Sequence, residues 1–510
     1  MNKTYDFDRP SVETGERRES CSQLETPLFT ALVEHANKNP IQFHIPGHKK
    51  GCGMDPDFRK FIGKNALSID LINIAPLDDL HHPKGIIKQA QELAAIAFGA
   101  DHTFFSVQGT SGVIMTMVMS VCGPGDKILV PRNVHKSIMS GIVFSGAAPI
   151  FIHPEVDLNL GISHGITPES VKRALEQHPD AKAVLVINPT YFGIVGDLKR
   201  IVDITHSYGI PVLVDEAHGV HIHFHHELPL SAMQAGADMA ATSVHKLGGS
   251  MTQSSILNIQ GSLVSKERVQ MILSMLTTTS TSYILLASLD TARKLLATEG
   301  RALLENTIRL AEQTRSQINE IDDLYCVGHE ILGTDATFAM DPTKLVISVK
   351  NLGITGYEVE KWLRDEFNIE VEMSDLYNIL CIITPGDTEE GLQKIVYALK
   401  ELSIEFKHQA NFNVEASVFL PEIPALALTP RDAFYAQTEA IPFEESAGRI
   451  IAEFIMVYPP GIPIFIPGEI ITEENLLYTK KNIEAGLPVQ GGEDYAMKSL
   501  RVIKEHHAIK

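Results

Sequence analysis

Four short apolar runs follow one another between residues 127 and 218, and segments with helical periodicity separate them. The runs are KILVP (127–131), APIFIH (148–153), AVLVIN (183–188) and VLVDEAH (212–218). This alternation predicts an α/β fold with a large, mainly parallel sheet and helices on both faces. Sheets of this kind bind ligands at the carboxyl ends of their strands, so the residues that follow each run are candidates for a site.

The remaining sequence predicts further units around this sheet. A chain of 510 residues is longer than one hydrophobic core normally supports. Residues 1–25 are polar and charged and predict a flexible tail, and residues 26–300 predict an N-terminal segment and the large domain. Residues 301–415 predict a smaller α/β domain, and a Pro-rich passage leads into a C-terminal domain at 416–510.

Composition excludes several classes of partner. Hydrophobic residues make up 44% and charged residues 21%, as in ordinary folded proteins. The formal charge of −20 argues against nucleic acid or an anionic membrane, since both need clustered Lys and Arg. The five cysteines form no CxxC pair, which favours free thiols in a reducing cytoplasm. The polar first 25 residues do not resemble a secretory signal, so a cytoplasmic protein is expected.

Two residues near strand ends predict covalent cofactor chemistry. Lys246, in TSVHKLGGS, has few charged neighbours, and its amine could be partly neutral as a Schiff-base lysine requires. The alternative is a surface lysine. Asp215 ends the apolar run VLVD, where an unpaired buried carboxylate is costly. A pyridinium nitrogen would be a suitable partner, and the alternative is an ion pair with another side chain.

Two more motifs fit the same chemistry. Gly109, Thr110 and Ser111 open an apolar helix, where backbone N–H groups and hydroxyls could seat a phosphate. The alternative is a helix cap without a ligand. His135 follows the run KILVP and could lie flat on an aromatic cofactor ring, or it could simply be a hydrogen-bonded histidine. A phosphate seat, a stacking histidine, an acid and a lysine thus occur in order, each near a strand end.

At this point the chain resembles the ornithine/lysine/arginine decarboxylase family of fold-type I pyridoxal-phosphate (PLP) enzymes. The resemblance runs from about residue 26 nearly to the end. The motifs that carry it are HIPGHKKG, LDDLHHPKGIIKQAQ, FFSVQGTSG, PRNVHKS, INPTYFG, VDEAHGVH, TSVHKLGGS and VYPPGIPIFIPGE. It is similar above all to the short bacterial biosynthetic members, which convert arginine to agmatine and CO2 for polyamine and spermidine biosynthesis.

The resemblance implies roles for individual residues. Lys246 would hold PLP as a Schiff base, Asp215 would pair with the ring nitrogen, and His135 would stack on one ring face. Ala217 would pack on the other face, with His218 beside it. The phosphate would be held by Thr110, Ser111, Ser243 and His245. No metal is expected. The family builds its site between subunits, so a homodimer or higher even oligomer is expected, with Ser280 and Thr281 reaching the partner's phosphate.

The reaction implied is loss of CO2 from a basic amino acid. Either His135 or Lys246 could give a proton to the reacting carbon, and the sequence does not choose between them. A basic substrate side chain should meet a carboxylate. Glu469 is the first candidate and Asp79 the second, and each could instead be a surface acid or a helix cap.

Three other functions remain open. Lysine or ornithine could be the substrate on the same scaffold, giving cadaverine or putrescine. A metal-dependent hydrolase is a remote alternative, because His221, His223 and His225 would share one face of a strand within the His218–His226 cluster. A non-catalytic regulator with a degenerate cofactor site is the third, and the presence of both Asp215 and Lys246 argues against it.

Overall fold

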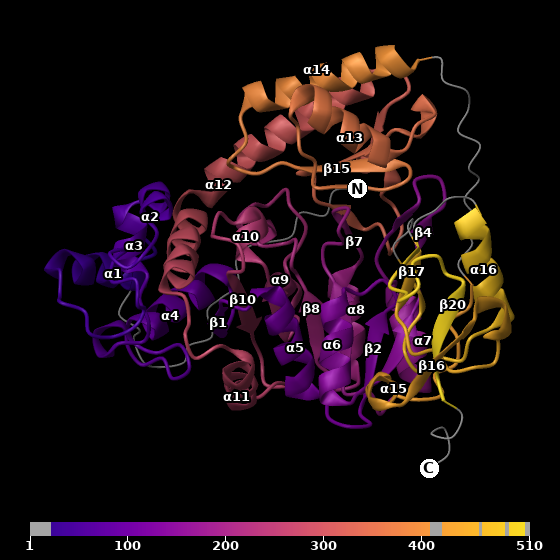
Figure 1. Cartoon of the computed structure of the whole chain (residues 1–510), viewed down its shortest axis with the longest axis horizontal. Coiled ribbons are helices and arrows are strands. Elements are labelled where there is room, and N and C mark those ends of the chain that lie inside the picture. The colour runs from indigo at the N-terminus through magenta and orange to yellow at the C-terminus, as the bar shows by residue number, and fades with distance from the viewer. Residues whose placement is uncertain (1–21, 408–420, 458–461, 485–488, 505–510) are drawn as a thin grey trace.

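A seven-stranded sheet forms the centre of the computed structural model, which describes residues 22–407, 421–457, 462–484 and 489–504 (Figure 1). Its strand order is β1-β10-β9-β8-β6-β2-β3. The strands are β1 (His102–Ser106), β2 (Lys127–Pro131), β3 (Ala148–Ile152), β6 (Ala183–Ile187), β8 (Val212–Asp215), β9 (Met239–Thr242) and β10 (Ser255–Ile259). Neighbouring strands from β9 to β3 are parallel, and only β10 runs against its neighbours. The α/β fold predicted from the sequence is confirmed.

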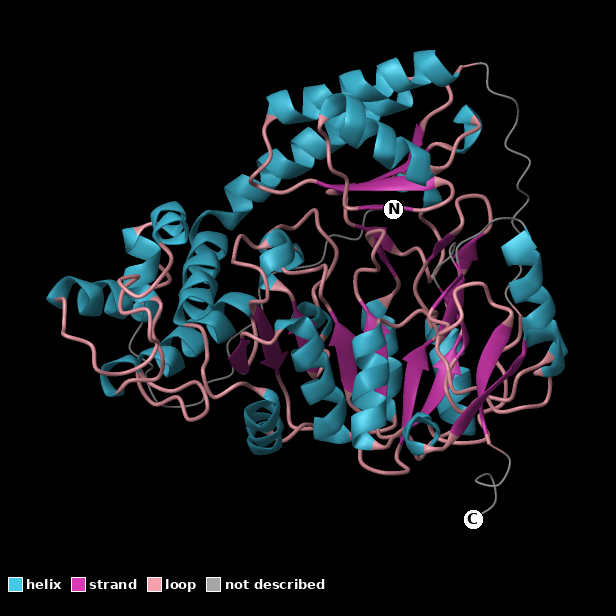
Figure 2. Ribbon diagram, in the orientation of Figure 1, coloured by secondary structure: helices cyan, strands magenta, loops and turns pink. Residues whose placement is uncertain are grey.

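Alternating side chains of the central strands pack on the two faces of this sheet. Leu185 and Leu213 pack in a cluster with α5 (Gly109–Val121), α6 (Lys136–Ser145) and α11 (Lys266–Leu276). Their neighbours along the strands face the opposite cluster, which contains α7 (Pro168–Gln177), α8 (Leu198–Ser207) and α9 (Ala232–Ala235). Helices therefore cover both faces, as Figure 2 shows.

The N-terminal segment packs beside the sheet. It contains α1 (Pro27–Lys38), α2 (Pro56–Ile62), α3 (Lys64–Ile69) and α4 (Ile86–Phe98), and it forms a core with the first half of α12 (Tyr283–Asn319). Gly99 ends α4 in a left-handed conformation with φ of 68°, which glycine adopts readily. Of the expected tail, residues 1–21 lie outside the described residues, whereas the carbonyls of Gln23 and Glu25 accept hydrogen bonds from Arg293.

A smaller α/β unit follows, at the top of Figure 1. Its antiparallel sheet has the order β11-β13-β15-β14, and α12, α13 (Gly356–Phe367) and α14 (Glu389–Phe406) pack on it. Its strands are β11 (Tyr325–Cys326), β13 (Lys344–Ser348), β14 (Met373–Ser374) and β15 (Asn378–Ile382). The boundary expected at residue 300 falls inside α12, a continuous helix of 37 residues that both units share.

The C-terminal unit packs against the β2–β3 side of the large sheet. Strands β16 and β20 form a two-stranded sheet, and β18, β17 and β19 form a three-stranded sheet in that order. The unit also contains α15 (Pro430–Tyr435) and α16 (Glu473–Glu484). The strand bounds are β16 (Thr438–Pro442), β17 (Ile455–Val457), β18 (Ile462–Phe465), β19 (Val489–Gln490) and β20 (Ser499–Ile503). None of the helices in the described ranges is both long and apolar enough to cross a membrane.

Candidate active site

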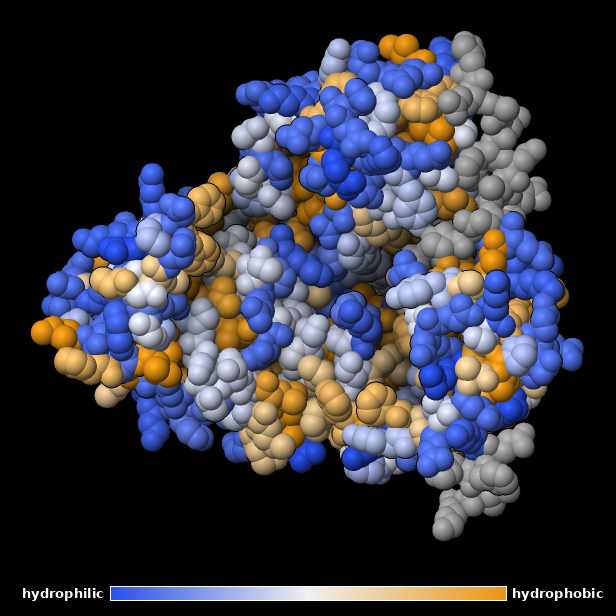
Figure 3. Space-filling view, in the orientation of Figure 1, coloured by the Kyte–Doolittle hydropathy of each residue, from blue (hydrophilic) through white to orange (hydrophobic). Residues whose placement is uncertain are grey.

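The loops that carry the predicted residues meet at one edge of the large sheet. Asp215 is the last residue of β8, and Ser243 and Lys246 follow the adjacent parallel strand β9. His135 follows β2 at the same edge, two strands away from β8. In the view of Figure 3, the molecular surface is hollowed between the smaller α/β unit and the large domain.

The start of α5 brings hydroxyl groups from three chain segments together. Thr110 Oγ1 hydrogen-bonds to Ser243 Oγ, and it lies 2.8 Å from Ser255 Oγ at the start of β10. Because β10 runs antiparallel, its first residue lies at the edge where β9 ends. The helix has no side-chain cap, and Gly109 before Thr110 has φ of 66°. Free N–H groups of a helix start beside these hydroxyls form a seat for an anion.

Asp215 is a buried carboxylate that has no basic partner among the residues that the structure describes. Its Oδ1 accepts a hydrogen bond from the Ala217 N–H at 3.2 Å, and within the described ranges no Lys, Arg or His forms an ion pair with it. Burial raises the pKa of Asp215 to about 6, although the Ala217 N–H and the charge of Lys246 oppose that rise. A cationic group placed here would therefore gain a strong partner.

Removing the charge of Asp215 should stabilise the cofactor-free chain above pH 6. A carboxyl whose pKa is raised on folding binds its proton more tightly in the folded state. Its contribution to stability is therefore full below about pH 4, falls as the pH rises to about 6 and stays low above that value. Asp215→Asn should melt at a higher temperature than the parent at pH 8, and the two should converge as the pH falls to about 4. Melting curves from pH 4 to 8 check this, and equal melting at pH 8 would contradict it.

Lys246 points its amine at a buried histidine. It lies in the short helix α10 (Val244–Leu247), and its Nζ is 2.7 Å from His218 Nε2. Burial lowers the pKa of Lys246, and the charges of Asp215 and Glu372 oppose this. The environment thus favours the neutral, nucleophilic amine that the sequence predicted.

His135 has a fixed orientation. It caps α6, where its Nδ1 accepts from the Ser137 N–H at 3.2 Å and lies 2.8 Å from Ser137 Oγ. Burial lowers the pKa of His135, and the positive charge of Lys246 adds to this. A neutral ring whose Nδ1 accepts carries its proton on Nε2. His135 is thus a hydrogen-bonded histidine at the end of β2, and its stacking on a cofactor ring stays a prediction.

The other residues expected to bind a cofactor lie on the same loops. Ser111 is in the first turn of α5, and Ala217 follows Asp215 in the turn after β8. His245 Nδ1 donates to the Ser254 carbonyl at 2.9 Å, which holds its ring beside the loop before β10. The structure therefore places Ser111, Ala217 and His245 at the edge where Asp215 and Lys246 lie.

Three residues that the sequence did not indicate also take part in this arrangement. Lys344 comes from the smaller unit, and its Nζ lies 3.0 Å from His218 Nδ1. The Tyr191 ring meets the His218 ring edge-on, with centroids 4.6 Å apart, and its hydroxyl donates to Glu372 at 2.7 Å. Lys344 and Glu372 belong to another unit of the chain, so no local pattern near the central strands could have revealed them.

The carboxylate of Glu469 is held by Arg132, the residue that directly follows β2. It forms a bidentate pair with Arg132: Nη1 bonds to Oε1, and Nη2 donates to Oε2 at 2.8 Å. The Ile466 N–H also donates to Oε2 at 2.8 Å, and both paired side chains are 1% exposed. This arrangement joins the C-terminal unit to the large domain, and it gives no support to the expectation that Glu469 contacts a substrate.

Asp79 lies in the N-terminal segment, and Ser280 and Thr281 lie in the 277–283 segment, which leads into α12. Asp79 is half-buried, and its Oδ1 accepts from the His81 N–H at 3.0 Å. The His81 ring in turn lies 3.1 Å from the Thr278 carbonyl, which ties the two loops together. Ser280 is exposed and Thr281 is buried, and neither is joined to the site described above by a hydrogen bond. Their expected partner contacts stay predictions.

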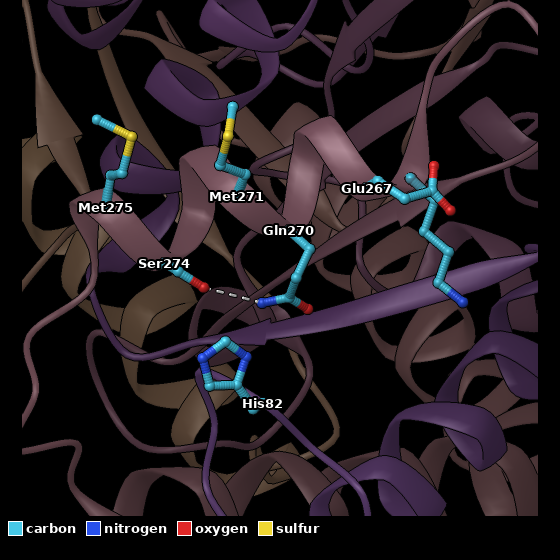
Figure 4. A pocket seen from close by; sticks show the side chains of 7 residues that line it. His82, Glu267, Gln270, Met271, Ser274 and Met275 are labelled. Carbon is cyan, nitrogen blue, oxygen red and sulfur yellow. Dashed lines mark hydrogen bonds between the residues drawn. The ribbon is translucent and has the colours of Figure 1, made fainter.

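A hollow of about 630 Å³ lies beside these loops (Figure 4). His82, Gln270 and Ser274 line it, and Gln270 donates to Ser274 at 3.1 Å. Met271 and Met275 present apolar surface at its rim and are 50% and 70% exposed.

The strand on which the metal-hydrolase alternative depends does not form at His221–His225. The residues after β8 form tight turns and a single 3-10 turn (Ile222–Phe224), because the Gly219 N–H bonds back to Glu216 and the Ile222 N–H to Gly219. The histidines consequently face different partners. His221 pairs with Asp341, His223 with Ser231, and His225 lies 3.8 Å from Glu305. Among the residues that the structure describes, no three His, Cys, Asp or Glu side chains are grouped as metal ligands.

Comparison with known proteins places these features in context. The model of the Orn/Lys/Arg decarboxylase major domain matches residues 26–391, and that of the family's C-terminal domain matches residues 412–484. The chain is 73% identical to an arginine decarboxylase of Bacillus anthracis, covering 96% of this chain and 99% of the relative. It is 72% identical to an arginine decarboxylase of Bacillus subtilis, covering 96% and 100%.

Solved structures show the same fold at lower identity. The Francisella novicida lysine decarboxylase LdcF superposes with a TM-score of 0.82 at 24% identity, over 94% of this chain and 81% of that one. The Escherichia coli constitutive lysine decarboxylase superposes with a TM-score of 0.80 at 22% identity, over 94% and 82%. At these identities the likeness concerns the fold alone.

Proposed function

Because this chain belongs to the Orn/Lys/Arg decarboxylase family, we propose that it decarboxylates arginine to agmatine and CO2 with PLP as its cofactor. The observation that carries the proposal is the identity of 72–73% to arginine decarboxylases over 96% of the chain. The sheet edge at which the loops of Asp215 and Lys246 meet supports it independently.

The residues at this edge fit PLP. The hydroxyls of Thr110 and Ser243 and the open start of α5 suit its phosphate, and the proposed phosphate contacts also include Ser111 and His245. Asp215, which has no basic partner among the described residues, suits a protonated ring nitrogen. When bound, PLP supplies an electron sink for the bond to the departing carboxylate.

The chain's own residues hold the cofactor in place and keep its ring nitrogen protonated. Lys246 supplies the amine that holds the cofactor's aldehyde, and the lowered pKa of that amine favours attack at neutral pH. Asp215 keeps a proton on the ring nitrogen, because its burial makes a cation the favoured neighbour. His135 would lie against one ring face and Ala217 against the other, and the Ser137 contacts hold the His135 ring in one orientation.

Recognition of the guanidinium group requires a carboxylate. Asp79 remains a candidate, and Glu372 is a second acid to consider. Glu372 is exposed, accepts from the Tyr191 hydroxyl and acts electrostatically on Lys246. Glu469 is not proposed for this role, because Arg132 occupies its carboxylate.

The products distinguish the three basic substrates. The purified protein with PLP is expected to form agmatine from arginine at least about tenfold faster than it forms cadaverine or putrescine, since a site that pairs with a planar guanidinium loses contacts to an ammonium. Amine products are quantified from arginine, lysine and ornithine at equal concentration. Cadaverine or putrescine as the main product would reassign the substrate within the family, and the absence of all three amines would reject the activity.

We also propose that the protein forms a homodimer or a higher even oligomer, in which Ser280 and Thr281 contact the cofactor phosphate of the partner subunit. We further propose that it acts in polyamine and spermidine biosynthesis in the cytoplasm. The apolar rim formed by Met271 and Met275, close to the 277–283 segment, supports an association surface there. Free thiols at all four described cysteines support a reducing compartment.

A further inference from the structure

Lys246, His218 and Lys344 form a chain of hydrogen-bonding contacts that runs from the candidate active site into the smaller unit. Lys246 Nζ lies 2.7 Å from His218 Nε2, and Lys344 Nζ lies 3.0 Å from His218 Nδ1. His218 and Lys344 are buried, with 7% and 0% exposure. Two lysines therefore share one imidazole, one at each ring nitrogen.

The hydrogen-bonding capacity of these groups limits their protonation. A neutral imidazole has one N–H donor and one acceptor nitrogen, and an ammonium can only donate. One lysine must therefore donate to His218 while the other accepts from it, and an amine that accepts is uncharged. If Lys344 donates to Nδ1, then Nε2 carries the ring proton and Lys246 is the neutral amine. The opposite tautomer reverses the two lysines.

The position of Lys344 is fixed by the junction between the two units. The strand β7 (Ile194–Val195) of the large domain pairs with β12 (Ala339–Met340), which lies just before Lys344. Gly193 closes this junction from the other side: a Cβ there would lie 2.7 Å from Lys344 Cγ, so only glycine leaves room for the lysine. Asp341 is held in turn by His221, at 3.0 Å from its Oδ2.

We propose that Lys344 is a positioning residue that sets, through His218, whether Lys246 carries a proton, and that this chain of contacts passes one proton to Lys246 in each turnover. The second part rests on the proposed decarboxylation. That reaction replaces a carboxylate by a hydrogen on carbon, so every turnover consumes one proton.

The transfer balances without any further reagent. An N–H bond of the Lys344 ammonium breaks and His218 Nδ1 gains that proton. The N–H bond at His218 Nε2 breaks and Lys246 Nζ gains the second proton. His218 ends neutral as the other tautomer, Lys246 becomes an ammonium, and Lys344 becomes an amine that later regains a proton from water. No electrons change hands.

The surrounding charges agree with this direction of transfer. Burial lowers the pKa of Lys344 to about 8, Asp341 and Glu372 oppose that, and Lys246 adds to it. Burial also lowers the pKa of His218 well below its usual value, and the positive charges of Lys344 and Lys246 and the rings of His135 and His221 contribute. His218 thus stays neutral and bridges, while Lys344 exchanges its proton near neutral pH.

The first test measures the amine of Lys246 directly. Full-length protein without PLP is acetylated between pH 6 and pH 10, and modification at residue 246 is followed by peptide mass spectrometry. Lys344→Met should raise the pKa of the Lys246 amine by about one unit or more, because a neighbouring cation and the fixed tautomer are both lost. Labelling at pH 7.5 should then fall roughly tenfold. Lys361→Met, an equally drastic change at an exposed lysine of α13, should leave it unchanged.

The second test separates a relay from a simple loss of charge. His218→Phe keeps the ring that meets Tyr191 but removes both nitrogens. Lys344→Met and His218→Phe should each lower kcat by about 100-fold and change KM by less than about threefold. If this chain of contacts is the route, the double variant should be no slower than the slower single variant. If the double variant instead lowers kcat by the product of the two single-variant factors, the proposed relay is overturned.

Folding and function are kept apart in these experiments. Melting curves are recorded first, and Lys344→Gln takes the place of Lys344→Met if the latter does not fold. Glutamine keeps an N–H donor facing Nδ1 but has no proton to release, so kcat should fall by the same factor. An unchanged labelling pKa together with an unchanged kcat would overturn the proposal. If the parent forms no amine from any basic amino acid, the proposed function fails, while the labelling still decides whether Lys344 controls Lys246.

Discussion

Replacing Lys246 with alanine is expected to lower agmatine formation by at least about 10⁴-fold, because both the covalent attachment of the cofactor and an acid–base group are lost. The fold should survive, since the only side-chain hydrogen bond of Lys246 that the structure shows is to His218. The phosphate seat does not depend on this lysine, so the variant should still bind PLP without a covalent bond. Agmatine is measured by mass spectrometry, and PLP retention by absorbance after gel filtration.

A matched lysine and a trapping experiment complete this test. Lys172→Ala, at a half-exposed lysine on α7 that pairs with Glu176, should keep full activity. Borohydride should fix PLP to Lys246 in the parent and in Lys172→Ala but not in Lys246→Ala. A reduced adduct mapped to another lysine, or more than about 1% of parental activity in Lys246→Ala, would assign the covalent role elsewhere.

The parallel strands explain why much of this site could be predicted from the sequence. Asp215 and Lys246 follow adjacent strands that run in the same direction, so their loops must meet at one edge. Thr110 follows β1, which ends at the same edge, and the reversed strand β10 begins there with Ser255. Local pattern was enough for His135 and Asp215, which lie at or just after the ends of predicted strands.

The other features of the site could not be predicted, because they depend largely on contacts between units and on turns that the local sequence pattern does not encode. Lys344 opens a strand of the smaller unit, where a lysine commonly faces solvent, and only the β7–β12 junction turns it toward His218. Glu469 was predicted to contact a substrate or else to be a surface acid or a helix cap, but its partner Arg132 is 337 positions away. The histidines after β8 alternate as in a strand, yet tight turns at Gly219 end the extended backbone before them.

Removing the carboxylate of Glu469 is expected to cost about 3–5 kcal/mol of stability, because it leaves the guanidinium of Arg132 buried without a counter-charge. Both side chains are 1% exposed, so water cannot replace the lost contact. Arg132 Nε still donates to the Pro463 carbonyl at 2.9 Å, but carbonyl oxygens do not neutralise its charge. Urea unfolding of Glu469→Ala should show this loss in the transition of the C-terminal unit, which the pair joins to the large domain.

The kinetics of the same variant separate a structural role from substrate binding. At a temperature where Glu469→Ala is folded, KM for arginine should stay within about twofold of the parent, because Arg132 rather than the substrate holds this carboxylate. Glu439→Ala breaks the partly exposed pair with Arg449 in the same unit and should cost less than about 1 kcal/mol. Replacing both buried partners, as Arg132→Met with Glu469→Leu, should recover most of the stability, since no uncompensated charge remains. A large rise in KM with unchanged stability would instead return Glu469 to the substrate site.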